Sequence, residues 1–136
     1  MHSFLLFFAT FALLPSAVLL APCPMDTCPC IRRGVFDSAW LTANNPTLAE
    51  QNNNYVFSAP NVTYPNCTSI IATCPSTAQM AQLKSGNITV GGVLLKNPLV
   101  FQPLICDENH NWRMVGYNQP MDANLLTANI SCATKV

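Results

Sequence analysis

Cysteine is the residue type with the clearest capacity for chemistry in this chain. Seven cysteines occur among 136 residues, at Cys23, Cys28, Cys30, Cys67, Cys74, Cys106 and Cys132. The closely spaced Cys28 and Cys30 could offer zinc ligands or a redox dithiol, but zinc pairs and redox motifs both have wider spacing. Disulfide bonds are the usual state of such a set in an oxidising compartment. We therefore expect disulfides, with no metal site and no cofactor.

Spacing limits how the cysteines can pair. Residues 67–74 are rich in β-branched side chains and predict a strand, in which Cys67 and Cys74 would lie about 23 Å apart. A disulfide needs Cα atoms within about 7 Å, so these two do not pair with each other. Cys28 and Cys30 would close a strained ring around one intervening residue. The connectivities that stay open all tie the N-terminal segment to the later part of the chain.

Cys23 is the seventh cysteine and lies outside the six-cysteine framework. An odd cysteine in an exported protein can bridge two chains, stay free, or be lost with the leader. The sequence thus allows a monomer or a disulfide-linked homodimer through Cys23.

Residues for acid–base or nucleophilic catalysis are few. A catalytic triad needs a histidine, and His110 lies in a polar turn beside two carboxylates, where a solvated hairpin tip is the simpler interpretation. Hydrolysis by paired carboxylates would need two acidic side chains on opposite sides of a cleft, and nothing in the spacing of the acidic residues brings two together in that way. The candidates are Asp26, Asp37, Glu50, Asp107, Glu108 and Asp122. We predict no catalytic residue and no enzyme, with a secreted hydrolase as a remote alternative.

Aromatic side chains could serve binding instead of catalysis. Trp40, Trp112 and Tyr117 could line a face for a sugar or a protein partner. Tryptophan after a cysteine hairpin more often packs into a core, and we expect that role for Trp112.

The N-terminal region indicates export. Residues 4–20 are almost entirely apolar and are followed by small residues, which is typical of a secretory signal peptide cleaved after Ala17 or Ala21. We assign residues 1–21 to the signal peptide and 22–136 to a single small domain. The mature chain is expected to be secreted and extracellular, without a membrane anchor. Its net charge of zero and 9% charged residues exclude nucleic acid as an expected partner.

Four N-glycosylation sequons occur in the chain, with acceptors Asn61, Asn66, Asn87 and Asn129. Two of them, at Asn87 and Asn129, lie in alternating segments. A period of two places the asparagines and hydroxyls outward, with Ile88, Val90, Ile130 and Cys132 inward.

Arg32-Arg33 is a dibasic pair just after Cys30. Cleavage after Arg33 would convert a secreted precursor into a signalling fragment that begins at Gly34. A solvated pair of side chains is the simpler interpretation.

The segments between these residues predict a mostly β fold. Candidate strands cover residues 62–64, 67–74, 88–90, 93–95, 99–106, 112–115 and 125–132, with Gly91-Gly92 and residues 107–111 as turns and Pro98 and Pro103 marking an edge or bulge. Short helices are predicted from Asn45-Pro46 and from Ser76, the latter capped with Gln79 and stopped by Gly86. Residues 44–58 predict a loop. The result is a small, disulfide-stapled, antiparallel β-sandwich-like domain with at most one or two short helices.

These motifs together resemble a known family. The run from Cys67 to Cys74-Pro75, Cys106 followed by a polar turn into Trp112, and a terminal strand ending at Cys132 are similar to the six-cysteine domain of nematode secreted proteins. The resemblance covers residues 28–132 and implies a small disulfide-linked β domain. The family has no known function, so the resemblance implies no activity.

The sequence therefore predicts a secreted, glycosylated extracellular domain with a binding or structural role. Its expected partner is an extracellular protein or a glycan. The first alternative is a secreted precursor that is cleaved after Arg33 to give a signalling fragment. The second and less favoured alternative is a secreted hydrolase.

Overall fold

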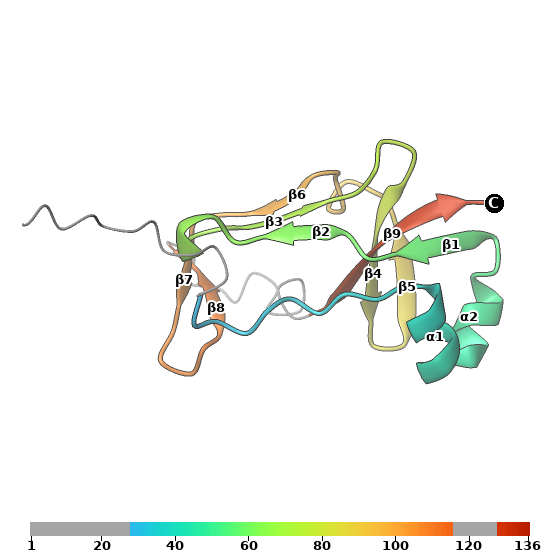
Figure 1. Cartoon of the computed structure of the whole chain (residues 1–136), viewed down its shortest axis with the longest axis horizontal. Coiled ribbons are helices and arrows are strands. Elements are labelled where there is room, and N and C mark those ends of the chain that lie inside the picture. The colour runs from blue at the N-terminus through green and yellow to red at the C-terminus, as the bar shows by residue number, and fades with distance from the viewer. Residues whose placement is uncertain (1–27, 116–127) are drawn as a thin grey trace, which may run out of the picture.

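The computed structural model describes residues 28–115 and 128–136 of the chain. Most of this part is antiparallel β-structure, with two short α-helices (Figure 1). In chain order the elements are α1 (Ser38–Asn44), α2 (Pro46–Gln51), β1 (Tyr55–Ser58), β2 (Asn61–Thr63), the 3-10 turn η1 (Pro65–Cys67), β3 (Ile70–Thr73), β4 (Gln79–Lys84), β5 (Asn87–Val90), β6 (Leu99–Phe101), β7 (Leu104–Cys106), β8 (Trp112–Met114) and β9 (Asn129–Lys135). The predicted class, a small disulfide-stapled antiparallel β domain with short helices, is confirmed.

The strands form three antiparallel sheets that follow one another along the long axis of the molecule (Figure 1). The large sheet has the order β1-β9-β4-β5, the middle sheet has the order β2-β3-β6, and β7 and β8 form a separate hairpin. β9 is the last strand in chain order, yet it lies inside the large sheet between β1 and β4.

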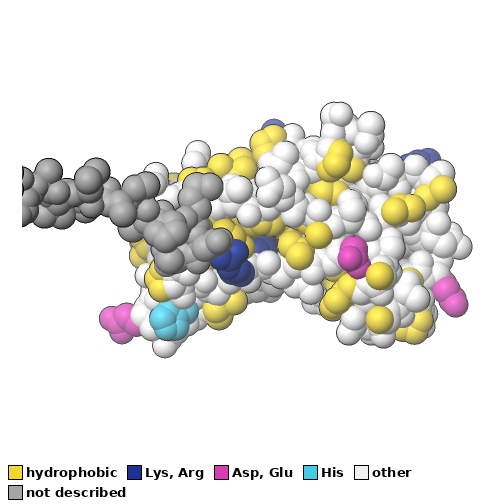
Figure 2. All heavy atoms as spheres, in the orientation of Figure 1, with side chains coloured by type: hydrophobic (Ala, Val, Ile, Leu, Met, Phe, Trp, Pro, Cys, Tyr) yellow, Lys and Arg dark blue, Asp and Glu magenta, His cyan; other side chains and the backbone are white. Residues whose placement is uncertain are grey.

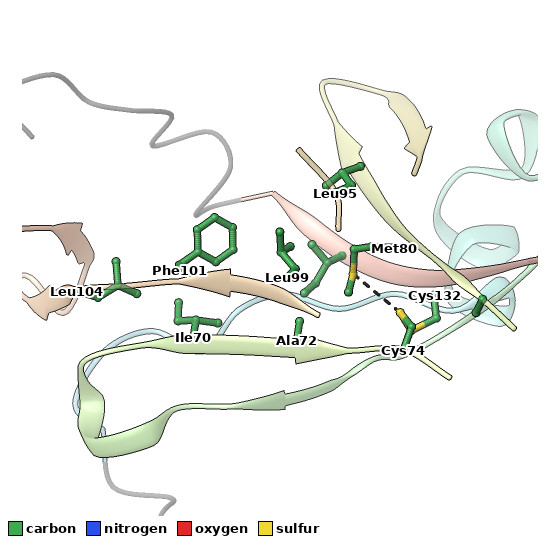
Figure 3. Close-up of a cluster of buried hydrophobic side chains, with 11 residues drawn as sticks. Ile70, Ala72, Cys74, Met80, Leu95, Leu99, Phe101, Leu104 and Cys132 are labelled. Atoms are coloured by element: carbon green, nitrogen blue, oxygen red, sulfur yellow. Dashed lines mark hydrogen bonds between the residues drawn. A yellow bond between two sulfur atoms is a disulfide. The ribbon is translucent and has the colours of Figure 1, made fainter. Parts of the chain in front are cut away.

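One hydrophobic core joins the middle sheet to the large sheet (Figure 3). Ile70 and Ala72 of β3 and Leu99 of β6 pack against Met80 of β4 and Cys132 of β9. Four of these five side chains are completely or almost completely inaccessible to solvent because they alternate inward along short strands.

A second core lies on the opposite face of the large sheet. Leu41 of α1 and Leu48 of α2 pack there with Phe57, Ala81 and Ala133. Since Met80 and Ala81 are neighbours in β4 and belong to different cores, both faces of this sheet are covered. The central strands therefore expose little side-chain surface.

The N-terminal segment, residues 28–37, runs along the molecule from the β7-β8 hairpin to α1 (Figure 1). At one end the Ile31 N–H donates to the His110 carbonyl at 2.8 Å. At the other end the Phe36 N–H donates to the carbonyl of Ile130, whose own N–H donates to Gly34 at 3.0 Å. The segment is thus paired at both ends with distant parts of the chain.

The helix predicted from Asn45-Pro46 is confirmed as α2, where the Asn45 side chain accepts from the Leu48 N–H and proline occupies the first turn. The preceding helix α1 was not predicted. Its cap is Asp37, whose carboxylate accepts from the Trp40 N–H at 2.7 Å. The prediction of a loop over residues 44–58 is wrong in part, since α2 and β1 both fall within it.

The helix predicted from Ser76 is wrong, because that region contains strand β4. The hairpin predicted across Gly91-Gly92 is also wrong. β5 pairs backwards with β4, and the turn between them is Ser85-Gly86, with φ values of 49° and 77°. Burial against two cores makes this segment a strand in place of a helix, because β4 is an inner strand of a sheet that is covered on both faces.

The strand predicted over residues 93–95 is wrong, since these residues form a turn. The remaining predicted strands are confirmed with changed limits. Residues 99–106 divide into β6 and β7 at Pro103, and residues 107–111 form the turn into β8. The first part of residues 67–74 is the 3-10 turn η1, so β3 begins only at Ile70. Of the predicted strand 125–132, only residues 128–132 are described, and β9 begins at Asn129.

Candidate functional site

Three disulfides hold the described part of the chain together. They join Cys28 to Cys67, Cys30 to Cys106, and Cys74 to Cys132. The predictions that Cys67 does not pair with Cys74, and that Cys28 does not pair with Cys30, are confirmed. The first two bridges tie the N-terminal segment to the later body, and the third joins the end of β3 to β9. Cys23 lies outside the described residues.

The first two bridges converge on a stack of side chains that we name the aromatic ladder: Arg32, Tyr64 and Trp112. The ring of Tyr64 stacks on that of Trp112, with centroids 5.8 Å apart and planes tilted by 11°. The guanidinium carbon of Arg32 lies 5.8 Å from the centroid of the Tyr64 ring. Three segments that are distant in sequence thus meet in one stack of a cation and two aromatic rings.

The N-terminal segment holds the polar ends of the ladder in place. The backbone N–H of Arg33 donates to the Tyr64 hydroxyl at 2.8 Å. The indole N–H of Trp112 donates to the Ile31 carbonyl at 2.9 Å. Both rings are half-buried and pack on the edge of the main core, as expected for Trp112, so each still exposes part of its surface.

Arg33 faces the interior, unlike Arg32. It is only 7% exposed, and its guanidinium lies 4.7 Å from the centroid of the Phe101 ring. Burial lowers the pKa of Arg33 to about 10, with Tyr64 opposing part of the shift. The side chain therefore keeps its charge at neutral pH. The interpretation of Arg32-Arg33 as a solvated pair is wrong for Arg33, because the segment folds against the core.

The β7-β8 turn places Asp107 and His110 beside the ladder. The Asp107 carboxylate accepts from the backbone N–H groups of Asn109 and Asn111 at 2.9 Å, and from Arg113 Nε at 2.8 Å. These contacts, led by Asn111, hold the pKa of Asp107 below its ordinary value, against a smaller opposing effect of desolvation. His110 is exposed with a φ of 61°, and its carbonyl accepts from Ile31.

The other candidate carboxylates are dispersed. Asp37 caps α1, Glu50 is exposed on α2, and Glu108 is exposed in the β7-β8 turn. Asp26 and Asp122 lie outside the described residues. Within residues 28–115 and 128–136, no group of three or more His, Cys, Asp or Glu side chains could hold a metal ion.

The remaining aromatic candidates do not join the ladder. Trp40 is 38% exposed on α1, where it contacts Phe36 with ring centroids 6.2 Å apart. Tyr117 lies outside the described residues.

The sequon acceptors occupy different environments. Asn61, Asn66 and Asn87 are exposed, in β2, η1 and β5 respectively. Asn129 is half-buried in the inner strand β9, where a Cβ on Gly34 would collide with its side chain.

The predicted alternation in the sequons at Asn87 and Asn129 is only partly right. It holds in β5, with Asn87 and Thr89 exposed and Ile88 and Val90 partly buried. It fails at Ser131, which is fully buried and donates to the Ser58 carbonyl at 3.0 Å, because both faces of the large sheet are covered.

The surface that surrounds the site has few charges. Charged side chains are scattered over the face in Figure 2, between apolar and uncharged polar ones. Two exposed isoleucines are sequence neighbours of the Cys30–Cys106 bridge: Ile31 is 63% exposed and Ile105 is 51% exposed. Flat rings, one cation and exposed aliphatic side chains suit contact with a ligand surface, such as the apolar face of a sugar or a protein side chain.

Sequence reasoning selected Trp112 but missed Tyr64 and Arg32 as its partners. Tyr64 was noted only as the end of a strand, and Arg32 only as half of a dibasic pair. The signal that could have found them is their position within a few residues of cysteines. The Cys28–Cys67 bridge brings the segment of Arg32 to that of Tyr64, and the Cys30–Cys106 bridge brings it to that of Trp112.

Comparison with protein families, with curated proteins and with solved structures finds no match to this chain. The resemblance to the nematode six-cysteine domain therefore stays a prediction. Among the described residues, no helix is long and apolar enough to cross a membrane.

Proposed function

We propose that this protein is a secreted, glycosylated extracellular domain that acts by binding, and that the aromatic ladder is its binding surface. The observation that carries the proposal is the convergence of two disulfides on the ladder. Cys28–Cys67 and Cys30–Cys106 fix the three segments from which Arg32, Tyr64 and Trp112 project. The ligand is an extracellular protein or a glycan.

The covalent framework supports the extracellular location. Three disulfides in a small domain are typical of proteins that fold in an oxidising compartment. The apolar N-terminal residues and the exposed sequon asparagines point the same way. The resemblance to secreted six-cysteine domains agrees with this location and adds no activity.

The geometry of the ladder supports binding over a purely structural role. Both rings have their polar atoms engaged by the N-terminal segment, so their orientation is set before any ligand arrives. A preorganised surface loses less conformational entropy on binding than a flexible one. Arg32 is exposed at the end of the stack and adds a charged donor.

Two assemblies fit the proposal, a monomer and a homodimer linked through Cys23. Cys23 precedes the first bridged cysteine by five positions, so a bridge there would leave the intrachain framework intact. Comparing wild type with Cys23→Ser by non-reducing electrophoresis decides between them. A dimer that disappears on reduction and in the variant supports the linked assembly.

Export and the framework are tested together on protein secreted from eukaryotic cells. We expect mass spectrometry under non-reducing conditions to find the three bridges, glycans on exposed sequons, and an N-terminus between residues 18 and 24. Free thiols at Cys28 to Cys132, or retention of the chain in the cytosol, would overturn the proposal.

The binding role is tested by titrating the secreted protein onto arrays of glycans and of extracellular proteins. We expect Arg32→Ala to weaken binding about tenfold, and Arg32→Lys to weaken it less because the charge remains. Lys84→Ala is the matched control, since it removes an exposed cation from the far end of β4. Equal binding by Arg32→Ala and wild type would exclude the ladder, and no binding by wild type to either array would favour a structural role.

A further inference from the structure

The two larger sheets have four edge strands, and the edge at β1 is closed by the protein itself. In β1, the Phe57 N–H donates to Ser38 Oγ at 2.8 Å, the Ser38 hydroxyl donates to the Phe57 carbonyl, and the Tyr55 N–H donates to Asn52. β6 and β2 are each only three residues long and are flanked by prolines, which have no N–H to offer: Pro98 and Pro103 around β6, Pro60 and Pro65 around β2. Open edges otherwise tend to pair with other chains.

Two of the edge strands, β2 and β5, share a further feature. The whole of β2 is the sequon Asn61-Val62-Thr63, and β5 begins with the sequon at Asn87. Both asparagines are exposed, and each is the first residue of its strand. These two sequons thus both fall on edge strands.

Charged residues, the usual protection of an edge strand, are absent from these two. Natural sheets often place lysine at an exposed edge to prevent pairing. Neither β2 nor β5 has a charged residue, in a chain with only 9% charged residues. An N-linked glycan at the same place would exclude a second strand, which must come within about 5 Å to pair.

We infer that Asn61 and Asn87 carry N-glycans that protect β2 and β5 from pairing with another chain. The inference rests on the proposed secretion, since these glycans are added only to exported chains. Asn66 is an exposed acceptor in η1, which follows β2 and is outside the edge strands. Asn129 stays unmodified in the folded protein, because it lies against Gly34 in an inner strand and a glycan there would prevent the sheet from forming.

The test compares variants of the secreted protein, all with Cys23→Ser so that no interchain bridge contributes. Asn61→Gln/Asn87→Gln removes both edge glycans and keeps the amides. Asn66→Gln is the matched control, because it removes one glycan outside the edges. Thr63→Ser/Thr89→Ser is the second control, because it changes both strands and keeps both sequons.

We expect peptide mass spectrometry to find glycans at Asn61 and Asn87 and none at Asn129. In light scattering, the apparent mass of the double glutamine variant should shift with concentration from monomer to dimer and larger species. Both controls should stay monomeric. If the double variant is retained in the cell, trimming the glycans of the purified protein with an endoglycosidase provides the same comparison.

Two results would overturn the inference while leaving the proposed function intact. One is a secreted wild-type protein that is glycosylated elsewhere but bare at Asn61 and Asn87. The other is a double variant, or a trimmed wild type, that stays monomeric at all concentrations. A chain that is never exported and carries no glycan would instead overturn the proposed function.

Discussion

At the scale of single residues, Tyr64 connects the hydrophobic core with the proposed binding surface. Its ring contacts Trp112 on the edge of the core, its hydroxyl accepts from the Arg33 N–H, and Arg32 lies over the ring. A tyrosine can serve all three contacts because it has an apolar body and one polar tip. The position of this one side chain therefore depends on the N-terminal segment that crosses it.

Asp107 makes the β7-β8 turn sensitive to acid. Its pKa is held below the ordinary value near 4, chiefly by the Asn111 N–H and also by Arg113. A carboxylate with a lowered folded pKa stabilises the native state above its unfolded pKa, and this contribution is lost as the pH falls through the folded value. We expect the melting temperature of wild type to fall below about pH 4, and Asp107→Asn to reduce that dependence.

The measurement is thermal unfolding from pH 7 to pH 2, followed by tryptophan fluorescence. Glu108→Gln is the control, because it removes an exposed carboxylate from the same turn. The same acid dependence in Asp107→Asn and wild type would show that the contacts of this carboxylate do not stabilise the fold.

At the scale of elements, the turn between β4 and β5 has a left-handed backbone conformation, which favours glycine and asparagine. Ser85 and Gly86 both have positive φ, as in the two-residue turns that prefer Asn-Gly. We expect Ser85→Asn to raise the free energy of unfolding by roughly 0.5 kcal/mol, and Gly86→Ala to lower it by about 1 kcal/mol. A Cβ at Gly86 would meet no atom within 4 Å, so the loss would be conformational.

Urea unfolding of the two variants checks this prediction. Ser85→Ala is the matched control, because alanine lacks the tolerance of asparagine for this conformation. Destabilisation by Ser85→Asn would contradict the turn geometry.

The Cys74–Cys132 bridge joins the middle sheet to the large sheet within the core. It closes a sequence separation of 58 residues, against 39 for Cys28–Cys67. Loop entropy predicts a similar loss of about 4 kcal/mol for removing either bridge. Cys74 and Cys132 are 5% and 0% exposed, so replacing them with alanine also leaves a cavity.

We therefore expect Cys74→Ala/Cys132→Ala to lower the free energy of unfolding by more than Cys28→Ala/Cys67→Ala does. Denaturant unfolding of both double variants measures the difference. Equal losses would show that the core adapts to the missing sulfur atoms.

The elements also show what the sequence could and could not predict. Asn45-Pro46 and the turn before Trp112 were read correctly, because caps and polar turns act within a few residues. Ser76 and Gln79 match a capping box and predict a helix where β4 lies, and only the two cores around Met80 and Ala81 make the segment a strand. The disulfide pairing and the aromatic ladder could not be predicted for the same reason, because both depend on contacts between segments that are distant in sequence.

At the scale of the whole molecule, the disulfides argue against release of a fragment at the dibasic pair. Arg33 is buried, and the segment that contains it is hydrogen-bonded at both ends. We expect the folded protein to resist trypsin at Arg33 while it is cut at Lys96, which is exposed and lies outside the helices and strands. A peptide that holds Cys28 and Cys30 would stay attached through two bridges even after a cut.

Mass spectrometry of digests with and without reduction checks this prediction. Lys96 serves as an internal control for protease activity. A secreted form with a free N-terminus at Gly34 would contradict it and would favour the alternative, a signalling precursor.

The position of β9 has a consequence for the order of events during synthesis. A ribosome delivers β1 and β4 first, but these two strands do not pair with each other and must wait for the strand that lies between them. Throughout that interval Cys74 is already present as a thiol while Cys132 has yet to emerge, so it is available to wrong partners. The native pairing is thus settled late, and we expect the yield of correctly bridged chains to depend on protein disulfide isomerase more than on the speed of translation.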